Sequence, residues 1–327
     1  MFVVQSKLPT AEEMCELVPA SKKIAERKFA YDAELRRLQL GRKKLIVVCG
    51  PCAADNPEAV AEYVRALKKL SAKTPDLYVV ARIYTAKPHS DGTGYPGVMF
   101  GDDGVDMSHG IAVARKMMID CLSVGLPVAD EILYPELYPY FSALVSYAFV
   151  GARSSYDALH RAYASGLTVC CGVKNGLDGN VSAAVDSLNA VAMPSVLPIG
   201  GEVFATNGNE FAHIVLRGGM SEEGFVPNLG RENIAEAKRL LHAKALNDFV
   251  MVDLSHANSG KRAEVQLANA RLVAANTNVN GVMAESYLHD GNGNEYGVSR
   301  TDECLSLEQT AELLQILQEG FATRIDK

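Results

Sequence analysis

Short apolar runs alternate along this chain with longer stretches in which apolar residues recur at helical spacing. Eight runs have the length of a buried strand, and each ends at or near a charged residue, a cysteine or a histidine. They are LIVVCG from 45, VVAR from 79, VADE from 128, VGAR from 150, CGVK from 171, IVLR from 214, VMVDLSH from 250 and GVMAE from 281. Buried strands that alternate with amphipathic helices predict an α/β fold, here a closed TIM (β/α)8 barrel.

The segment before the first run reads as a helix over residues 21–40, with Ser21 as its cap and Gly41 at its end. It has no place in a minimal barrel, so we expect it to lie outside as an extension. The chain is accordingly divided into an N-terminal extension, 1–44, and a catalytic barrel domain, 45–327.

Helices are also expected between the strands. Asn56-Pro57-Glu58 supplies a cap, a first-turn proline and an acid at a helix start. Ser306-Leu307-Glu308-Gln309 fits a capping box. The remaining periodic stretches predict helices over 108–124, 135–147, 156–165, 180–192, 232–245, 258–275 and 306–321.

Two segments exceed what a minimal barrel needs. Residues 88–107 are rich in glycine and aspartate and too long for an ordinary strand-to-helix loop, which is typical of a lid or binding loop. Residues 195–212 contain a ninth apolar run. We interpret this run as a β-hairpin inserted before the sixth barrel strand.

Composition narrows the class of protein. The chain has 327 residues, of which 48% are hydrophobic, enough for one large core. A net charge of -7 without long charged runs argues against nucleic acid as a partner. No apolar run approaches the roughly 20 residues of a membrane helix, and no signal peptide is read. Seven cysteines, mostly within apolar runs, are expected to be reduced thiols of a cytoplasmic protein.

A metal site is expected where the strands end, because the carboxyl ends of barrel strands converge on one mouth. Cys52, His256, Glu285 and Asp302 lie at or beyond different strand ends. A thiolate, an imidazole and carboxylates suit a divalent transition metal. Taken singly, Cys52 could be a small buried hydrophobe and His256 a hydrogen-bonded structural histidine, so the prediction depends on the group as a whole.

Five cations are expected at the same mouth, namely Arg82, Lys87, Arg153, Lys174 and Arg217. Arginine binds carboxylate and phosphate with a planar fork, and lysine adds a point charge. A small phosphorylated acid is the simplest ligand for such a set. The alternative is a structural ion network with Glu131, Asp253 and other acids. Five buried like charges repel one another unless a ligand compensates, which favours the ligand.

An ordered set of motifs makes the chain resemble the type I, metal-dependent DAHP synthases. These enzymes condense phosphoenolpyruvate (PEP) with erythrose 4-phosphate to form 3-deoxy-D-arabino-heptulosonate 7-phosphate (DAHP), at the entry to aromatic amino-acid biosynthesis in the shikimate pathway. The resemblance extends from about residue 8 to 320. It rests on GPCAADNP near 50, ARIYTAKP near 81, GLPVADE near 125, GARSSYDALHRAYASGL near 151, GVKNGLDGN near 172, HIVLRGG near 213, DLSHANSGK near 253, GVMAESYL near 281 and SRTDECLS near 299.

The resemblance implies a role for each candidate. One divalent ion (Mn favoured, with Co, Fe and Zn as alternatives) would bind Cys52, His256, Glu285 and Asp302. PEP would bind Arg82, Lys87, Arg153, Lys174 and Arg217. Lys87 would be a general acid at the new hydroxyl, and Glu131 would help to order water or a cation. The partners would be PEP and an aldehyde, with neither nucleic acid nor membrane, and the protein would be a homo-oligomer (dimer or tetramer).

The acceptor loop departs from the family pattern. Family members read Lys-Pro-Arg-Thr, in which the arginine and threonine hold the acceptor's phosphate, whereas this chain reads Lys87-Pro88-His89-Ser90. Histidine is mostly neutral at pH 7 and lacks the guanidinium fork. Erythrose 4-phosphate and a different, possibly unphosphorylated aldehyde of a specialised pathway therefore both remain open. Two further alternatives are a Schiff-base aldolase that uses Lys174 and a non-catalytic PEP-binding regulator.

Overall fold

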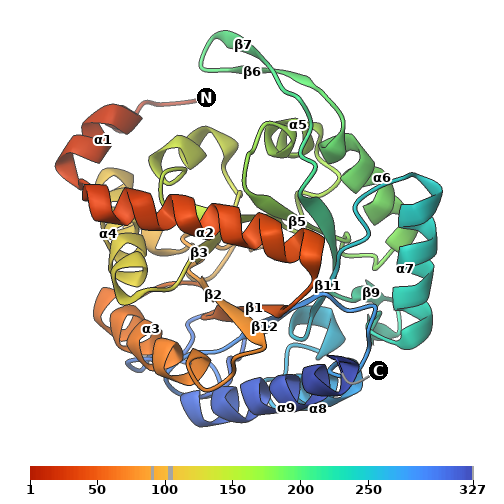
Figure 1. Cartoon of the computed structure of the whole chain (residues 1–327). Coiled ribbons are helices and arrows are strands. Elements are labelled where there is room, and N and C mark those ends of the chain that lie inside the picture. The colour runs from red at the N-terminus through yellow and green to blue at the C-terminus, as the bar shows by residue number, and fades with distance from the viewer. Residues whose placement is uncertain (90–91, 102–105, 326–327) are drawn as a thin grey trace.

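Eight parallel strands close into a barrel in a computed structural model that describes residues 1–89, 92–101 and 106–325. Around the barrel their order is β1, β12, β11, β8, β5, β4, β3 and β2 (Figure 1). Seven of the eight apolar runs lie in barrel strands, and the run from 150 only begins at the last residue of β4. The eight parallel strands confirm the predicted TIM barrel. The strands are β1 Leu45–Gly50, β2 Leu77–Arg82, β3 Val128–Glu131, β4 Val145–Val150, β5 Cys170–Lys174, β8 Ala212–Leu216, β11 Val250–Asp253 and β12 Gly281–Glu285.

Helices surround the barrel and bury one apolar face each against the strands. Capping follows the sequence: the Asn56 side chain accepts from the backbone N–H of Ala59, and Ser306 and Gln309 cap each other. The barrel helices are α3 Pro57–Ser71, α4 Met107–Val124, α5 Ala158–Ser165, α6 Val181–Ala192, α7 Arg231–Ala243, α8 Val265–Val273 and α9 Leu307–Ile325.

Two of the predicted helices are wrong in extent or type. Residues 135–147 were expected to form one helix, but only a 3-10 helix, η2 (Pro135–Tyr140), is present and β4 follows from Val145. Pro139 lies inside η2, and a proline interrupts α-helical hydrogen bonding. The expected helix over 258–275 is likewise divided into a short 3-10 helix, η3 (His256–Asn258), and α8.

The N-terminal extension closes one end of the barrel. A short helix, α1 (Ala11–Leu17), precedes α2 (Lys22–Gly41), whose last residue is Gly41 and whose left-handed cap is Arg42 rather than the expected glycine. In Figure 1, α2 crosses the barrel opening and leads directly into β1. Leu35 and Leu38 are buried among interior side chains near the strand starts. The amino-terminal end of the barrel is therefore covered by α2, and the carboxyl-terminal mouth lies at the opposite end.

Two antiparallel hairpins extend from the barrel. The first pairs β6 (Val196–Ile199) with β7 (Glu202–Ala205) directly before β8, the sixth barrel strand, which confirms the predicted insertion. The second pairs β9 (Gly219–Ser221) with β10 (Gly224–Val226) and was not predicted. A 3-10 turn, η1 (Val98–Phe100), lies in the long loop after β2.

Two further expectations concern the environment of the chain. All seven cysteines are free thiols, as expected of reduced residues. Among the helices of residues 1–89, 92–101 and 106–325, none combines the length and apolarity needed to cross a membrane.

Candidate active site

One cavity at the carboxyl-terminal mouth brings together all five cations that the sequence singled out. Arg82, Lys87, Arg153, Lys174 and Arg217 line it, together with Tyr84, Glu131 and His256. They come from the ends of separate strands or from the loops that follow, which is where a parallel barrel collects its functional groups.

Three of the four predicted metal ligands form a compact group beside this cavity. One ligand atom each of Cys52, Glu285 and Asp302 lies within 4.8 Å of the others. Burial, together with the charge of Glu285, raises the pKa of the Cys52 thiol to about 11. A divalent cation favours the thiolate and offsets the cost of desolvating two carboxylates. The mixed sulfur and oxygen donors therefore fit a divalent transition metal.

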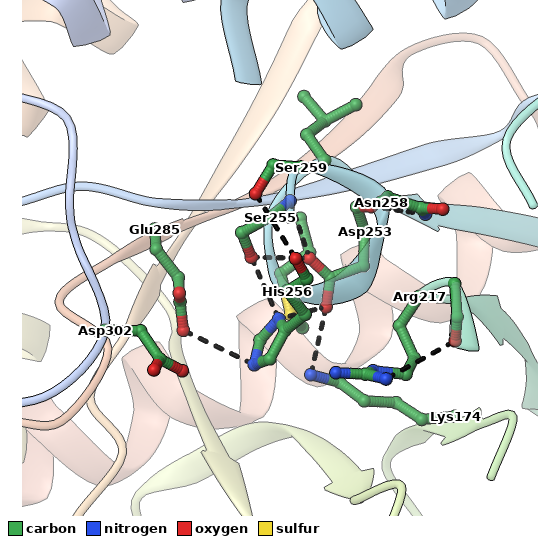
Figure 2. Close-up of polar contacts among 12 residues, drawn as sticks. Lys174, Arg217, Asp253, Ser255, His256, Asn258, Ser259, Glu285 and Asp302 are labelled. Atoms are coloured by element: carbon green, nitrogen blue, oxygen red, sulfur yellow. Dashed lines mark hydrogen bonds and ion pairs between the residues drawn. The ribbon is translucent and has the colours of Figure 1, made fainter. Parts of the chain in front are cut away.

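His256 is adjacent to Glu285, but its ring nitrogens do not lie within 4.8 Å of the ligand atoms of all three residues. Its Nε2 is 3.5 Å from Glu285 Oε1, and its Nδ1 is 2.8 Å from Asp253 Oδ2, as Figure 2 shows. Burial lowers the pKa of His256. A carboxylate that accepts the Nδ1 proton leaves a lone pair on Nε2, which is how proteins orient a metal-ligating histidine. His256 thus fits the role of fourth ligand.

Lys87 connects the metal-ligand group to the cation cavity. Its Nζ lies 2.6 Å from Cys52 Sγ and 3.3 Å from Asp302 Oδ2. Burial acts to lower the pKa of Lys87, but the charges of Cys52, Glu285 and Asp302 outweigh it and raise the pKa overall. The lysine is held as an ammonium whose proton points to the site.

Arg82 is fully buried, and its guanidinium donates hydrogen bonds to other groups of the protein. Its Nη2 donates to Glu285 Oε1 at 2.8 Å and to the carbonyl oxygen of Cys52 at 3.0 Å, while Nε donates to the carbonyl oxygen of Pro51 at 3.1 Å. Its guanidinium also stacks on the Tyr84 ring. Arg82 lines the cavity and at the same time positions the carboxylate of Glu285 and the loop that carries Cys52.

The remaining cations face the cavity from the end of β5 and from the segments that follow β4 and β8. Lys174 Nζ pairs with Asp253 Oδ2 at 3.1 Å, so part of the ion network considered as an alternative is present. Arg217 is also buried, and burial lowers the pKa of its guanidinium. Arg217 Nε and the Tyr84 hydroxyl are buried atoms without a hydrogen-bond partner among the described residues. Such orphaned donors favour an anionic ligand at this position.

Glu131 faces the same cavity from the end of β3. Its carboxylate packs against Gly151, where an added Cβ would lie only 2.0 Å from Oε1. Because Gly151 has no side chain, the carboxylate of Glu131 can lie against its backbone in the lining of the cavity.

Three asparagines that sequence reasoning missed fix the loops of the cation cavity. Asn175 Oδ1 accepts the backbone N–H of Arg217 at 2.8 Å. Asn228 Oδ1 accepts the N–H of Gly218, and Asn258 donates to the carbonyl oxygens of Leu216 and Asp253. These contacts tie together the loops after β5, β8 and β11. Sequence periodicity has no signal for such contacts, because the asparagines lie in loops far apart along the chain.

A second cavity adjoins the first on the side of the altered loop. Lys87, Pro88 and His89 line it, as do Lys261, Arg300 and Thr301, which sequence reasoning did not single out. The His89 ring contacts its own loop, with Nε2 2.8 Å from the carbonyl oxygen of Tyr95. Ser90, the other predicted acceptor residue after Pro88, lies outside the described residues.

Known proteins match nearly the whole chain. The model of the DAHP synthetase I family matches residues 28–323. The Tyr-sensitive phospho-2-dehydro-3-deoxyheptonate aldolase of Escherichia coli K12 is 36% identical over 300 residues, which cover 85% of this chain and 83% of the relative. The tyrosine-inhibited enzyme of that name from Schizosaccharomyces pombe is 32% identical over 348 residues, covering 98% of this chain and 90% of the relative.

The fold agrees with these matches. The solved structure of phospho-2-dehydro-3-deoxyheptonate aldolase from Francisella tularensis superposes with a TM-score of 0.93 at 30% identity, covering 99% of both chains. The family match, the sequence identities and the superposition all cover the barrel that carries the site. The chain therefore belongs to the DAHP synthetase I family.

Proposed function

We propose that this protein condenses PEP with erythrose 4-phosphate to give DAHP and inorganic phosphate. The main support is the cavity in which five cations lie beside the group of Cys52, Glu285 and Asp302. Relatives at 32–36% identity are named phospho-2-dehydro-3-deoxyheptonate aldolases. These names support the same chemistry and give no support to a different acceptor.

PEP binding is assigned to the cations of the cavity. Arg153, Lys174 and Arg217 would hold its phosphate and carboxylate through charge-assisted hydrogen bonds. Arg82 and Lys87 add positive charge on the side of the metal-ligand group. The orphaned Nε of Arg217 would gain an acceptor when the anion binds.

Cys52, His256, Glu285 and Asp302 would hold one divalent metal ion, for which we favour Mn. When bound, the ion supplies a Lewis acid for the aldehyde oxygen of the acceptor. Lys87, beside Cys52 and Asp302, is placed to donate a proton to that oxygen as it becomes a hydroxyl.

The bond changes balance without a further reactant except water. C3 of PEP forms a bond to the aldehyde carbon, and the aldehyde oxygen takes a proton from Lys87. Water adds to C2 of the former PEP and passes one proton to Lys87, which restores its ammonium. The C2–O bond to phosphate then breaks, phosphate leaves with the remaining hydroxyl proton, and a ketone is left at C2. Glu131, which faces the cavity from β3, is placed to order that water.

The test measures DAHP formation by the purified protein with PEP, erythrose 4-phosphate and Mn²⁺. We expect turnover that is lost with a chelator and restored by Mn²⁺. Full turnover with unphosphorylated erythrose and none with erythrose 4-phosphate would overturn the acceptor assignment. Binding of PEP and metal without turnover of any aldehyde would favour the regulator.

A Schiff-base mechanism is less compatible with the site. Burial lowers the pKa of Lys174, which favours the neutral amine that a Schiff base requires. However, Lys174 Nζ is held 3.1 Å from Asp253 Oδ2 and lies among the cations of the cavity, which suits an anion-binding role better than nucleophilic attack. Treatment with borohydride in the presence of PEP and acceptor should leave the mass of the protein unchanged. A covalent adduct on Lys174 would reverse this conclusion.

Assembly and compartment also belong to the proposal. We propose a homodimer or homotetramer in the cytoplasm, where the seven free thiols stay reduced. Light scattering of the purified protein at several concentrations measures the mass, and a monomer at all of them would refute the assembly.

A further inference from the structure

The cavity beside the altered loop contains an arginine that forms no ion pair among the described residues. Arg300 lines this cavity from the loop between β12 and α9, and its side chain is exposed. Within the described ranges, no carboxylate lies within ion-pair distance of its guanidinium. The guanidinium instead stacks over the Tyr95 ring, 4.1 Å from the ring centroid. This stacking fixes the plane of the fork and leaves its N–H groups to a ligand.

The lysines of this cavity are already engaged. Lys87 contacts Cys52 Sγ and Asp302 Oδ2, and Lys261 pairs with Asp302 Oδ1 at 3.1 Å. Both are therefore committed to the metal-ligand group. The charge of Arg300 is better placed than theirs to serve a ligand of the cavity.

Thr301 provides a second, independent observation. Its Oγ1 is buried and has no hydrogen-bond partner among residues 1–89, 92–101 and 106–325, although Thr301 lines the cavity. Its backbone is held in place, since its N–H donates to Ser299 Oγ and its carbonyl oxygen accepts from Asn292. A buried hydroxyl without a partner calls for a ligand or water.

The His89 side chain, which also lines this cavity, is poorly suited to bind an anion. His89 Nε2 lies 2.8 Å from the carbonyl oxygen of Tyr95, so this nitrogen is engaged with the loop. The His89 ring also packs on Gly94, where an added Cβ would lie 2.9 Å from the ring. Since the ring is tied to its own loop, His89 does not replace the arginine that related loops carry.

We propose that Arg300 and Thr301 bind the phosphate of the aldehyde acceptor, in place of the Arg-Thr pair of related loops. The two residues directly precede Asp302, so one short loop would reach the phosphate end with Arg300 and the metal-ligand group with Asp302. This inference deepens the proposed function and depends on it for the identity of the acceptor. It makes Arg300 and Thr301 the residues that select a phosphorylated aldehyde over an unphosphorylated one.

The first experiment measures binding without turnover. Erythritol 4-phosphate has the acceptor's phosphate but no aldehyde, so it cannot condense. Calorimetric titration into the Mn²⁺ and PEP complex should give a dissociation constant roughly 10- to 100-fold weaker for Arg300→Ala than for the unchanged protein. Thr301→Val should weaken binding by a smaller factor, and Arg300→Lys should fall between.

A matched control uses a neighbouring arginine of the mouth. Arg262 is exposed, pairs with Glu264 and does not line the cavity. Arg262→Ala should bind erythritol 4-phosphate as the unchanged protein does. Equal affinity of the unchanged protein and Arg300→Ala would overturn the proposal, as would absence of binding to the unchanged protein.

The second experiment measures kinetics. Arg300→Ala should raise the KM for erythrose 4-phosphate while the KM for PEP and the activity with free erythrose stay unchanged. An equal loss with both aldehydes would overturn the role in phosphate recognition. Failure of the unchanged protein to turn over erythrose 4-phosphate, with binding of erythritol 4-phosphate still dependent on Arg300, would refute the proposed function but support the anion subsite.

Discussion

Replacing Arg82 by lysine should weaken the metal site more than PEP binding. Arg82 is 1% exposed and donates to three oxygens, those of Glu285, Cys52 and Pro51. A lysine keeps the positive charge but has a single nitrogen, which cannot reach all three acceptors from one position. The substitution therefore separates the charge of Arg82 from its geometry.

The magnitude follows from the hydrogen bonds that a lysine cannot make. Two charge-assisted hydrogen bonds would be broken in a site without solvent screening, which costs about 3 kcal/mol of unfolding free energy. Glu285 would no longer have the guanidinium that orients its carboxylate, and removal of such a partner typically weakens metal affinity by about 10- to 100-fold. The KM for PEP, measured at saturating metal, should change less than the metal affinity.

The assay is a titration of activity with buffered Mn²⁺ at saturating substrates, followed by PEP kinetics at saturating Mn²⁺. Thermal unfolding with and without Mn²⁺ reports the stability change. Lys116→Arg, an exposed i,i+4 partner of Asp120, is a suitable surface control. A variant with unchanged Mn²⁺ affinity and a strongly raised KM for PEP would refute the reasoning and make Arg82 chiefly a PEP ligand.

The remaining predictions concern steric and titrating positions. Gly50→Ala should lower stability by about 1–3 kcal/mol, because its Cβ would lie 2.3 Å from the backbone oxygen of Arg82; an unchanged melting temperature contradicts this. Gly151→Ala should displace the Glu131 carboxylate and lower kcat, and normal turnover would show that the carboxylate position is unimportant. Burial lowers the pKa of His213 to about 4, below the 6.5 of an unfolded chain. Because the unfolded chain binds a proton at this histidine more readily than the folded protein does, the folding free energy is fully favourable above pH 6.5 and weakens by about 3 kcal/mol in total as pH falls toward 4. His213→Gln should therefore reduce the difference in denaturation midpoint between pH 7 and pH 4. The same midpoint difference in both proteins would refute this.

The strand ends were predictable because burial and charge change abruptly there. Seven of the eight apolar runs lie in barrel strands, and Arg82, Lys174 and Glu285 end β2, β5 and β12. Barrel geometry then brings such residues together without any further information.

Other features depend on contacts that a linear pattern does not contain. The 3-10 helix at Pro135–Tyr140 has apolar residues at helical spacing, and only its internal proline warns against an α-helix. Arg300 and Thr301 lie in an irregular loop, where no periodicity marks a residue as facing a cavity. The hydrogen bonds of Arg82 to the protein could not be predicted either, since the guanidinium of a strand-end arginine can face a ligand or the protein.

The seam of the barrel places the first strand beside the last. β1 pairs with β12 from Ile46 with Gly281 to Gly50 with Glu285. During synthesis, most of the polypeptide must therefore leave the ribosome before β1 meets this neighbour, and until then its edge is exposed to wrong pairing. Cys52 meets Glu285 across the same seam. The step that closes the barrel is thus also the step that assembles the metal-ligand group, so a nascent or truncated chain lacking β12 would have neither.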